Sequence, residues 1–164
     1  MIGYTRLLFY SMKNIWIKKQ VLKLVFTLFF WVFLTMNLSA EDAHVVVEIS
    51  NIIINGGKVS IGIFSNAEEF KKEEPYMGFE LESTNEVLFQ GILLPHGEYV
   101  ISAYQDTNNN GKLDTGLFGI PKELVGISNY FGKGFPSGNF NKQKIPINDT
   151  TGTITIGLYK LRLF

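Results

Sequence analysis

The segment HVVVEISNIIINGGKVSIGIF (residues 44–64) holds two runs of β-branched residues on either side of a glycine turn. Apolar and polar residues alternate in both runs, which is the period of two expected of half-buried strands. The inward positions are Val45, Val47 and Ile49 in the first run and Val59, Ile61 and Ile63 in the second. Because the NGG of residues 55–57 is a tight-turn signal, the pattern predicts a β-hairpin.

The rest of the chain beyond residue 64 is also dominated by strand patterns. We expect strands within residues 77–83, 86–92, 98–106, 142–148 and 151–164, with Tyr99, Ile101 and Ala103 on one face. Pro146 predicts that its strand lies at a sheet edge. One short helix is expected after Ser65, which has the capping-box spacing to Glu68, and Pro75 should end it. About seven strands and one short helix indicate an all-β fold, an antiparallel β-sandwich.

The first forty residues differ from the rest and predict a secretory signal peptide. They contain five basic residues and no acidic one, then the apolar run LVFTLFFWVFL (residues 24–34) and the small residues of NLSA before position 41. Cleavage after Ala40 would leave residues 41–164 as a single domain, periplasmic or on the cell surface. The alternative is an uncleaved anchor, although a run of 11 residues is shorter than the roughly 20 that span a bilayer. MKNIWIKK is a more usual signal start, so translation could begin at Met12.

The net charge and the absence of cysteine argue against several classes of protein. Five of the 15 basic residues and none of the 15 acidic residues lie before position 41, so the mature chain has 10 minus 15, a net charge of −5. This sign argues against a nucleic-acid partner, which requires a basic surface. The chain has no cysteine, so it has neither a disulfide nor the acylated cysteine of a lipoprotein.

The stretch DTNNNGKLD (residues 106–114) follows the D-x-[DN]-x-[DN]-G pattern of a calcium loop. Ca²⁺ takes six to eight hard oxygen ligands, and alternating Asp and Asn side chains supply them. The predicted ligands are Asp106, Asn108, Asn110, the backbone carbonyl of Lys112, and Asp114. Position twelve of the pattern, which should be a bidentate Glu, is Leu117, so we expect weak binding unless Glu123 or another loop folds back to complete the shell.

A metal-free turn explains the same residues. Asx side chains build turns by bonding their own backbone, and Gly111 would take the left-handed conformation. Sequence alone leaves both interpretations open.

Residues 106–140 are rich in glycine, asparagine and aromatic residues and show no sustained periodicity. The rings are Phe118, Tyr130, Phe131, Phe135 and Phe140. They either fold back as a satellite core or form a surface for a glycan, a peptide or an envelope protein. No catalytic motif is recognisable, and a hydrolytic site would have to combine Asp106, Asp114, Glu123 and His96.

Four motifs in order carry a family resemblance. They are G-x-V-x-I-x-I-F at residues 57–64, L-P-x-G-x-Y at 94–99, D-x-N-x-N-G-K-x-D at 106–114, and G-x-P-x-E-x-x-G-x-S-N at 119–129. In this order they resemble the bacterial family called domain of unknown function 2141. The resemblance implies an exported sandwich similar to the transthyretin or carboxypeptidase-regulatory type, and it implies no catalytic residues. Leu124 and Val125 stand where members more often have small or polar pairs.

Overall fold

The computed structural model describes residues 19–28, 30 and 42–162. The chain divides into two compact units, Met1–Ser39 and Ala40–Phe164. In the first unit residues 19–28 are helical, and their apolar side chains are exposed. Within the described ranges, no helix combines the length and the apolar character needed to cross a membrane. The predicted start at Met12, the cleavage site after Ala40 and five of the eleven residues of the apolar run 24–34 lie outside the described residues.

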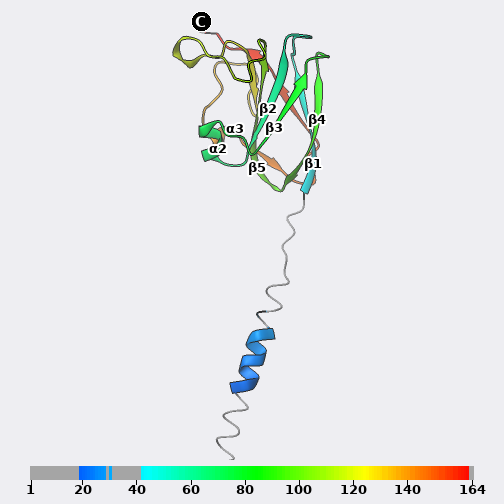
Figure 1. The fold of residues 1–164 in the computed structure, drawn as a ribbon, viewed down its shortest axis with the longest axis vertical. Coiled ribbons are helices and arrows are strands. Elements are labelled where there is room, and N and C mark those ends of the chain that lie inside the picture. The colour runs from blue at the N-terminus through cyan, green and yellow to red at the C-terminus, as the bar shows by residue number, and fades with distance from the viewer. Residues whose placement is uncertain (1–18, 29, 31–41, 163–164) are drawn as a thin grey trace, which may run out of the picture. The chain divides into compact units, whose positions relative to one another are not determined.

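The second unit is a two-sheet β-sandwich (Figure 1), as the sequence predicts. Its nine described strands are β1 (Asp42–Ser50), β2 (Lys58–Phe64), β3 (Met77–Glu82), β4 (Leu88–Pro95), β5 (Gly97–Asp106), β6 (Leu124–Ile127), β7 (Ile145–Ile147), β8 (Thr153–Gly157) and β9 (Tyr159–Lys160). The helical elements of this unit are α2 (Ala67–Lys72), α3 (Phe140–Gln143) and the 3-10 turn η1 (Leu117–Gly119).

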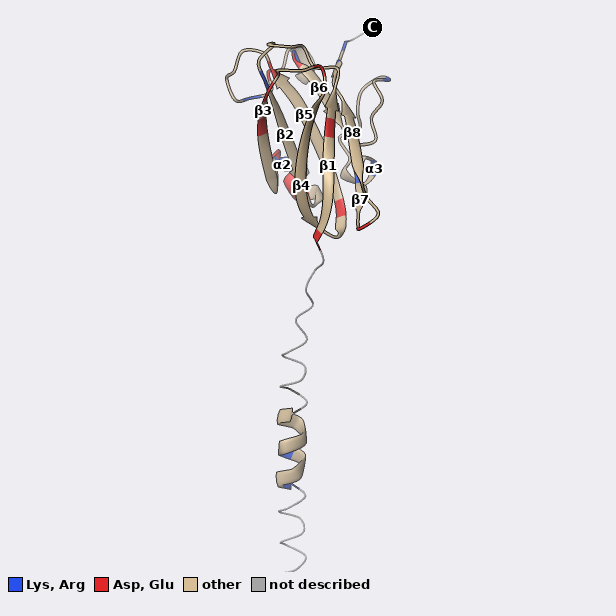
Figure 2. Ribbon diagram, turned by 90° about the vertical axis from the view of Figure 1, so that its right-hand side faces the viewer, with Lys and Arg blue, Asp and Glu red and all other residues tan. Residues whose placement is uncertain are grey.

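One sheet has the order β4-β1-β8, and Figure 2 shows these strands side by side. The other has the order β3-β2-β5-β6-β9, with β7 pairing the start of β5. Most pairs are antiparallel, but β8 runs parallel to β1, with Val46 opposite Thr153 and Ser50 opposite Gly157. Pro146 in β7 pairs with Glu98 of β5 and lies off the main strand order, which confirms its predicted edge position.

The predicted hairpin of residues 44–64 is wrong. β1 pairs with β4 and β8, whereas β2 pairs with β3 and β5 in the other sheet. The connection crosses between the sheets, and the buried Gln105 side chain holds it in place. The Gln105 amide nitrogen donates to the Ile53 carbonyl at 2.7 Å, and its oxygen accepts from the Ile53 N–H at 3.0 Å.

The inward faces predicted from alternation are confirmed. All nine predicted inward positions of residues 45–49, 59–63 and 99–103 belong to one buried cluster between the sheets. A second cluster covers the outer face of the larger sheet, where Phe64, Val100, Val125, Ile127, Tyr130 and Leu161 pack together. Both clusters lie within residues 43–161. Because both clusters lie in the second unit, we expect residues 41–164 to fold without the preceding segment.

Several local predictions need correction. β6 lies inside the segment 106–140 that showed no periodicity, and residues 151–164 form two strands in different sheets rather than one. Part of the predicted strand 142–148 is the end of α3. The cap of α2 is Asn66, whose side-chain oxygen accepts from the N–H groups of Glu68 and Glu69, one residue later than the expected Ser65. Ser65 instead contacts the Glu69 carboxylate.

Candidate cation-binding loop

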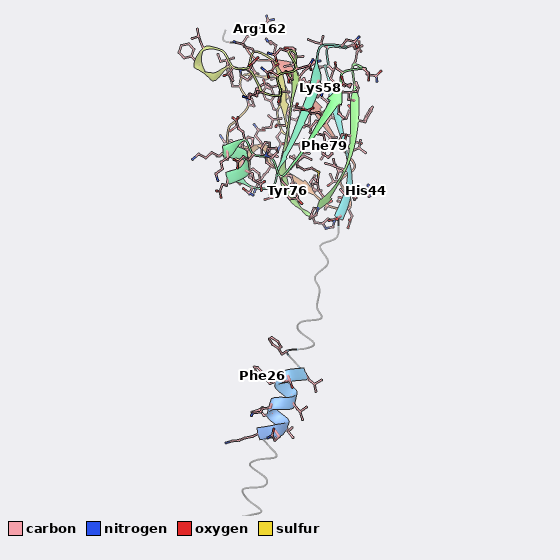
Figure 3. The ribbon with its side chains drawn as sticks, viewed as in Figure 1. Phe26, His44, Lys58, Tyr76, Phe79 and Arg162 are labelled. Carbon is pink, nitrogen blue, oxygen red and sulfur yellow. The ribbon has the colours of Figure 1, made fainter. Side chains whose placement is uncertain are left out.

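The predicted calcium residues lie in the connection between β5 and β6, at one end of the sandwich. Asp106 ends β5 and pairs in register with Lys58, the first residue of β2. Figure 3 places Lys58 at the same end as Arg162 and away from His44 and Tyr76. The loop is therefore held by the two central strands of the larger sheet.

Asp106 lies at the centre of the loop and is only 2% exposed. One carboxylate oxygen accepts from the Gly111 N–H at 2.6 Å, and the other accepts from the Asn110 N–H at 3.1 Å. Gly111 has φ +74°, the left-handed conformation that the turn requires and that glycine adopts without strain. The loop thus wraps around the Asp106 carboxylate.

The remaining three side chains of the pattern meet at Asp114. The Asn108 amide donates to Asp114 Oδ2 at 2.7 Å, and the Asn110 amide lies 3.3 Å from both carboxylate oxygens. The Asn108 side-chain oxygen accepts from the Asn110 N–H, and the Asn110 side-chain oxygen accepts from the Lys112 N–H. These contacts form the Asx turns of the metal-free interpretation, and they also bring Asn108, Asn110 and Asp114 into mutual contact.

Glu123 closes the base of the loop. It is 3% exposed; Oε1 accepts from the Thr107 N–H at 2.8 Å, and Oε2 accepts from the Asp114 N–H at 3.1 Å. Glu123 does fold back towards the loop, but its carboxylate binds the backbone at both ends of the loop. The sequence around Glu123 could not have indicated this structural role without the fold.

Beyond Asp114 the chain departs from the calcium-loop pattern. The Lys122 N–H donates to the Asp114 carbonyl at 2.8 Å, Thr115 bridges to Pro121, and the Gly116 N–H donates to the Ile120 carbonyl. This narrow turn carries Leu117 at its tip, 83% exposed. Position twelve is therefore removed from the loop centre, and Leu117 has no place in a ligand shell.

The surroundings of the loop are polar. Asn109 Oδ1 accepts from the Lys58 N–H at 3.1 Å. The pKa of the Lys58 ammonium is raised, first by its hydrogen bond to Glu80 and more weakly by the charge of Asp106. An open hollow of about 450 Å³ adjoins this contact, lined by Asn55, Gly57, Lys58, Glu82, Ser83, Thr84 and Asn109.

The charges of the loop lack partners of opposite sign. Among residues 19–28, 30 and 42–162, neither Asp106 nor Glu123 forms a salt bridge. Nor do three or more His, Cys, Asp or Glu side chains in these ranges group so as to hold a metal ion. A cation in the loop would depend on Asn108, Asn110 and a carbonyl as well as on Asp106 and Asp114.

The hypothetical hydrolytic constellation is not brought together. His96 precedes β5 and contacts Asp149 at 2.9 Å, whereas Asp106 ends the same strand. A strand of ten residues at about 3.3 Å each separates its ends by roughly 30 Å. His96 therefore cannot act on a substrate bound at Asp106, Asp114 and Glu123.

Two of the five aromatic residues of the segment are packed in the domain and three are exposed. Tyr130 and Phe140 pack in the outer cluster, and Tyr130 meets Tyr159 edge to face with ring centroids 5.6 Å apart. Phe118, Phe131 and Phe135 remain exposed. The satellite core thus accounts for two rings of the five.

Ser128 and Asn129 of the GISN motif have structural contacts that the sequence did not indicate. Buried Ser128 accepts from the Ile101 N–H at 3.2 Å and donates to the Gln143 carbonyl at 2.6 Å. Asn129, at φ 59°, donates from its amide to the Lys144 carbonyl. The pair fastens the end of β6 to β5 and to α3.

Comparison with known proteins gives one family. Searches of curated proteins and of solved structures found no match. The model of a family described as "Uncharacterized protein conserved in bacteria (DUF2141)" matches residues 47–155, a span from within β1 to within β8 that includes the whole loop. Since this is more than half of the 164 residues, the chain belongs to the DUF2141 family of bacterial proteins.

Proposed function

We propose that the domain is an exported β-sandwich binding module whose β5–β6 loop takes up Ca²⁺ through Asp106, Asn108, Asn110, the Lys112 carbonyl and Asp114. The observation that carries the proposal is the convergence of side chains in this loop: Asn108 and Asn110 both reach the Asp114 carboxylate, beside the buried carboxylate of Asp106. Two carboxylates in one loop, neither of them in a salt bridge among the described residues, favour a divalent cation.

The ligand set suits Ca²⁺ because every donor is a hard oxygen. The Asn108 and Asn110 oxygens accept from the N–H groups of Asn110 and Lys112, so both side chains would have to leave these contacts to turn their oxygens towards an ion at Asp114. With two carboxylates and no bidentate Glu, we expect a dissociation constant near the weak end for calcium modules, about 10⁻⁴ to 10⁻³ M. Such a site is useful only where calcium is abundant, which agrees with the export that the N-terminal sequence predicts.

Thermal unfolding of residues 41–164 in millimolar calcium and in chelator tests the proposal. At calcium concentrations tenfold above the dissociation constant, the ion should add about 1.4 kcal/mol to the free energy of unfolding. Asp114→Asn should abolish this gain, because it removes one of the two ligand charges while keeping the size of the side chain. Asp106→Ala should abolish it too, with a lower stability in chelator because Gly111 and Asn110 lose their acceptor.

The matched control is Asp149→Asn, the same substitution at an exposed aspartate that contacts His96 outside the loop. It should keep the full calcium response. A wild-type domain whose unfolding temperature is the same in calcium and in chelator would remove the calcium proposal.

A second candidate function is a metal-free binding surface for a glycan, a peptide or an envelope protein. The exposure of Phe131, at 77%, and of Phe135 favours it, since aromatic rings on a long connection form binding surfaces. Binding of a glycan, a peptide or an envelope protein that persists in chelator and is lost in the Phe131→Ser variant would support this candidate over the calcium module.

The relation to exported sandwiches of the transthyretin or carboxypeptidase-regulatory type is part of the same proposal. It is supported by the L-P-x-G-x-Y turn between β4 and β5. There the Tyr99 hydroxyl donates to the Pro95 carbonyl at 2.9 Å and fixes the entry into the strand.

A further inference from the structure

Strand β4 (Leu88–Pro95) forms one edge of the smaller sheet, whose order is β4-β1-β8. Figure 1 shows it at the outer side of the sandwich, beside β1. Within residues 42–162, no strand pairs with its second side. A strand edge of this length offers backbone N–H and C=O groups to another strand, and proteins usually protect such an edge with charges, proline, a bulge or a covering element.

The pairing of β1 identifies the backbone groups of β4 that point to the unpaired side. The Val46 N–H donates to the Gly152 carbonyl at 3.1 Å, on the side of β8, so it points away from β4. Val46 stands opposite Gly91, and hydrogen-bonded and non-hydrogen-bonded pairs alternate along an antiparallel ladder. The N–H and C=O groups of Phe89, Gly91 and Leu93 therefore point away from β1. We call these three residues the open edge.

No other element bonds to the open edge in the part of the chain that the structure describes. The backbone hydrogen bonds outside the strand ladders do not reach it. The Gln90 amide donates to the Gly91 carbonyl at 2.8 Å, but this contact is local and a strand N–H can replace it. Phe89 and Leu93 are 63% and 49% exposed on the outer face of the sheet. The open edge thus combines free backbone groups with apolar side chains.

The other sheet edges are protected in ways that β4 is not. β3 carries Glu80 and Glu82, and Glu80 pairs with Lys58 at 3.2 Å. β8 lies against β6, where a Cβ on Gly126 would overlap the Gly157 carbonyl oxygen. β7 and β9 have three residues and two. β4 has eight residues, LFQGILLP, of which none is charged and only the last is proline.

We propose that two copies of the domain pair through their open edges, antiparallel about a two-fold axis at Gly91. Phe89 and Leu93 are both two residues from Gly91, so each Phe89 stands opposite Leu93 of the second copy. Each hydrogen-bonded pair exchanges two bonds, which gives about six inter-strand hydrogen bonds. The two three-stranded sheets join into one continuous sheet, with two apolar cross-strand pairs on its outer face. The proposal does not depend on the calcium site.

The open edge is complementary to itself, which favours a second copy over a different chain. A two-fold interface requires a surface that matches its own rotated image, as Phe89 and Leu93 do about Gly91. The same register keeps like charges apart, because Glu86, before the strand, falls beside His96 of the second copy. The net charge of −5 on each domain opposes association at a distance, and about 0.15 M salt screens it beyond about 8 Å.

Sedimentation equilibrium of residues 41–164 tests the inference, at roughly 5 μM to 1 mM protein in about 0.15 M salt with chelator. Because the interface is smaller than the roughly 1,600 Å² of a standard one, we expect a dissociation constant of about 10–100 μM. A lysine on an edge strand hinders pairing, so Leu93→Lys should raise this constant about tenfold or more. Phe89→Thr removes the other member of the same pair, keeps a strand-forming residue and should raise it too. Cooperative thermal unfolding checks that each protein is folded.

The matched control is Leu117→Lys, the same substitution at a leucine that is 83% exposed in η1. It changes the net charge equally and should leave the dissociation constant unchanged. Hydrogen exchange locates the contact. The amides of Phe89, Gly91 and Leu93 should exchange more slowly as the protein concentration rises, because only in the dimer do they have acceptors.

A domain that stays monomeric at about 1 mM would overturn the proposal and leave the open edge to a different chain. A dimer that is equally strong in Leu93→Lys and Phe89→Thr would place the contact elsewhere and overturn it as well. An equal loss of association in Leu117→Lys would indicate unspecific apolar contact, with the same consequence. Exchange at the three amides that is independent of concentration in a dimeric sample would exclude strand pairing.

Discussion

Glu123 links the two ends of the loop through a single buried carboxylate. Its two oxygens accept from the N–H groups of Thr107, just after β5, and Asp114, nine residues before Glu123 itself. Hydrogen bonds to an ionised acceptor are stronger than neutral ones. The residue therefore fixes where Asp114 lies relative to Asp106, whether or not a cation is bound between them.

Substitution of Glu123 by Gln should destabilise the domain. The amide presents an N–H₂ group to one of two backbone donors, so one buried N–H loses its acceptor, at a cost of about 1–3 kcal/mol. Glu74→Gln, the same change at an exposed position after α2, should cost little. Urea unfolding compares the variants, and hydrogen exchange at the Thr107 and Asp114 amides should rise only in Glu123→Gln. Equal stability of both variants would contradict this role of Glu123.

Strand β6 brings the two sheets into close approach. A Cβ built on Gly126 would overlap the Gly157 carbonyl oxygen and lie 2.8 Å from Ile156 Cγ2, both in β8 of the other sheet. Gly126 thus lets the edge of the three-stranded sheet pack directly on the larger sheet. The close contact positions β6, and β6 in turn receives the chain as it leaves Glu123.

Gly126→Ala should therefore open the sandwich at this edge. We expect a loss of about 1–3 kcal/mol in the free energy of unfolding, since the added methyl group has no room and backbone must move. Gly91→Ala is the matched control, because a Cβ at Gly91 in β4 meets nothing within 4 Å. That variant should be neutral or slightly stabilised, since glycine weakens a strand interior. Chemical denaturation of both variants checks the difference, and a tolerated methyl group at 126 would refute the close-packing argument.

Alternation in the sequence predicted which strand residues face inward but not which strands pair. Val45 and Val59 lie where the pattern puts them, yet the chain between them crosses to another sheet and is held in place by Gln105, which is distant in sequence. β6 was missed because four residues with a central glycine show no periodicity. The sequence predicted which residues form the candidate loop. The two hydrogen bonds that Glu123 accepts from the loop backbone depend on the register of β6, so the sequence could not predict them.

At the scale of the whole molecule, the chain has two units, and different observations bear on each of them. The domain of residues 40–164 contains both hydrophobic clusters. The preceding residues supply the basic and apolar pattern of a signal peptide. Export and removal of that segment remain a prediction from sequence, and the composition of the chain offers a direct way to follow them.

Both tryptophans of the chain, Trp16 and Trp31, lie before the predicted cleavage site. The exported product should therefore lack tryptophan fluorescence and show tyrosine emission alone, while unprocessed chain keeps the tryptophan signal. Fractionation of the producing cells followed by intact mass measurement checks the site, with an N-terminus at Glu41 expected. Ala40→Arg, which replaces the small residue at the cut, should retain the longer form. A tryptophan-containing product in the exported fraction would argue for an uncleaved anchor.

The parallel pairing of β1 with β8 also governs the order of folding. Val46 of the first strand lies opposite Thr153, near the end of the chain, so the middle strand of the smaller sheet has one open side until residues 153–157 have been synthesised. Contacts between such distant segments are slow to form, because loop closure must precede them. We therefore expect the smaller sheet to stay incomplete until residues 153–157 have been synthesised, a state compatible with the export that the N-terminal sequence predicts.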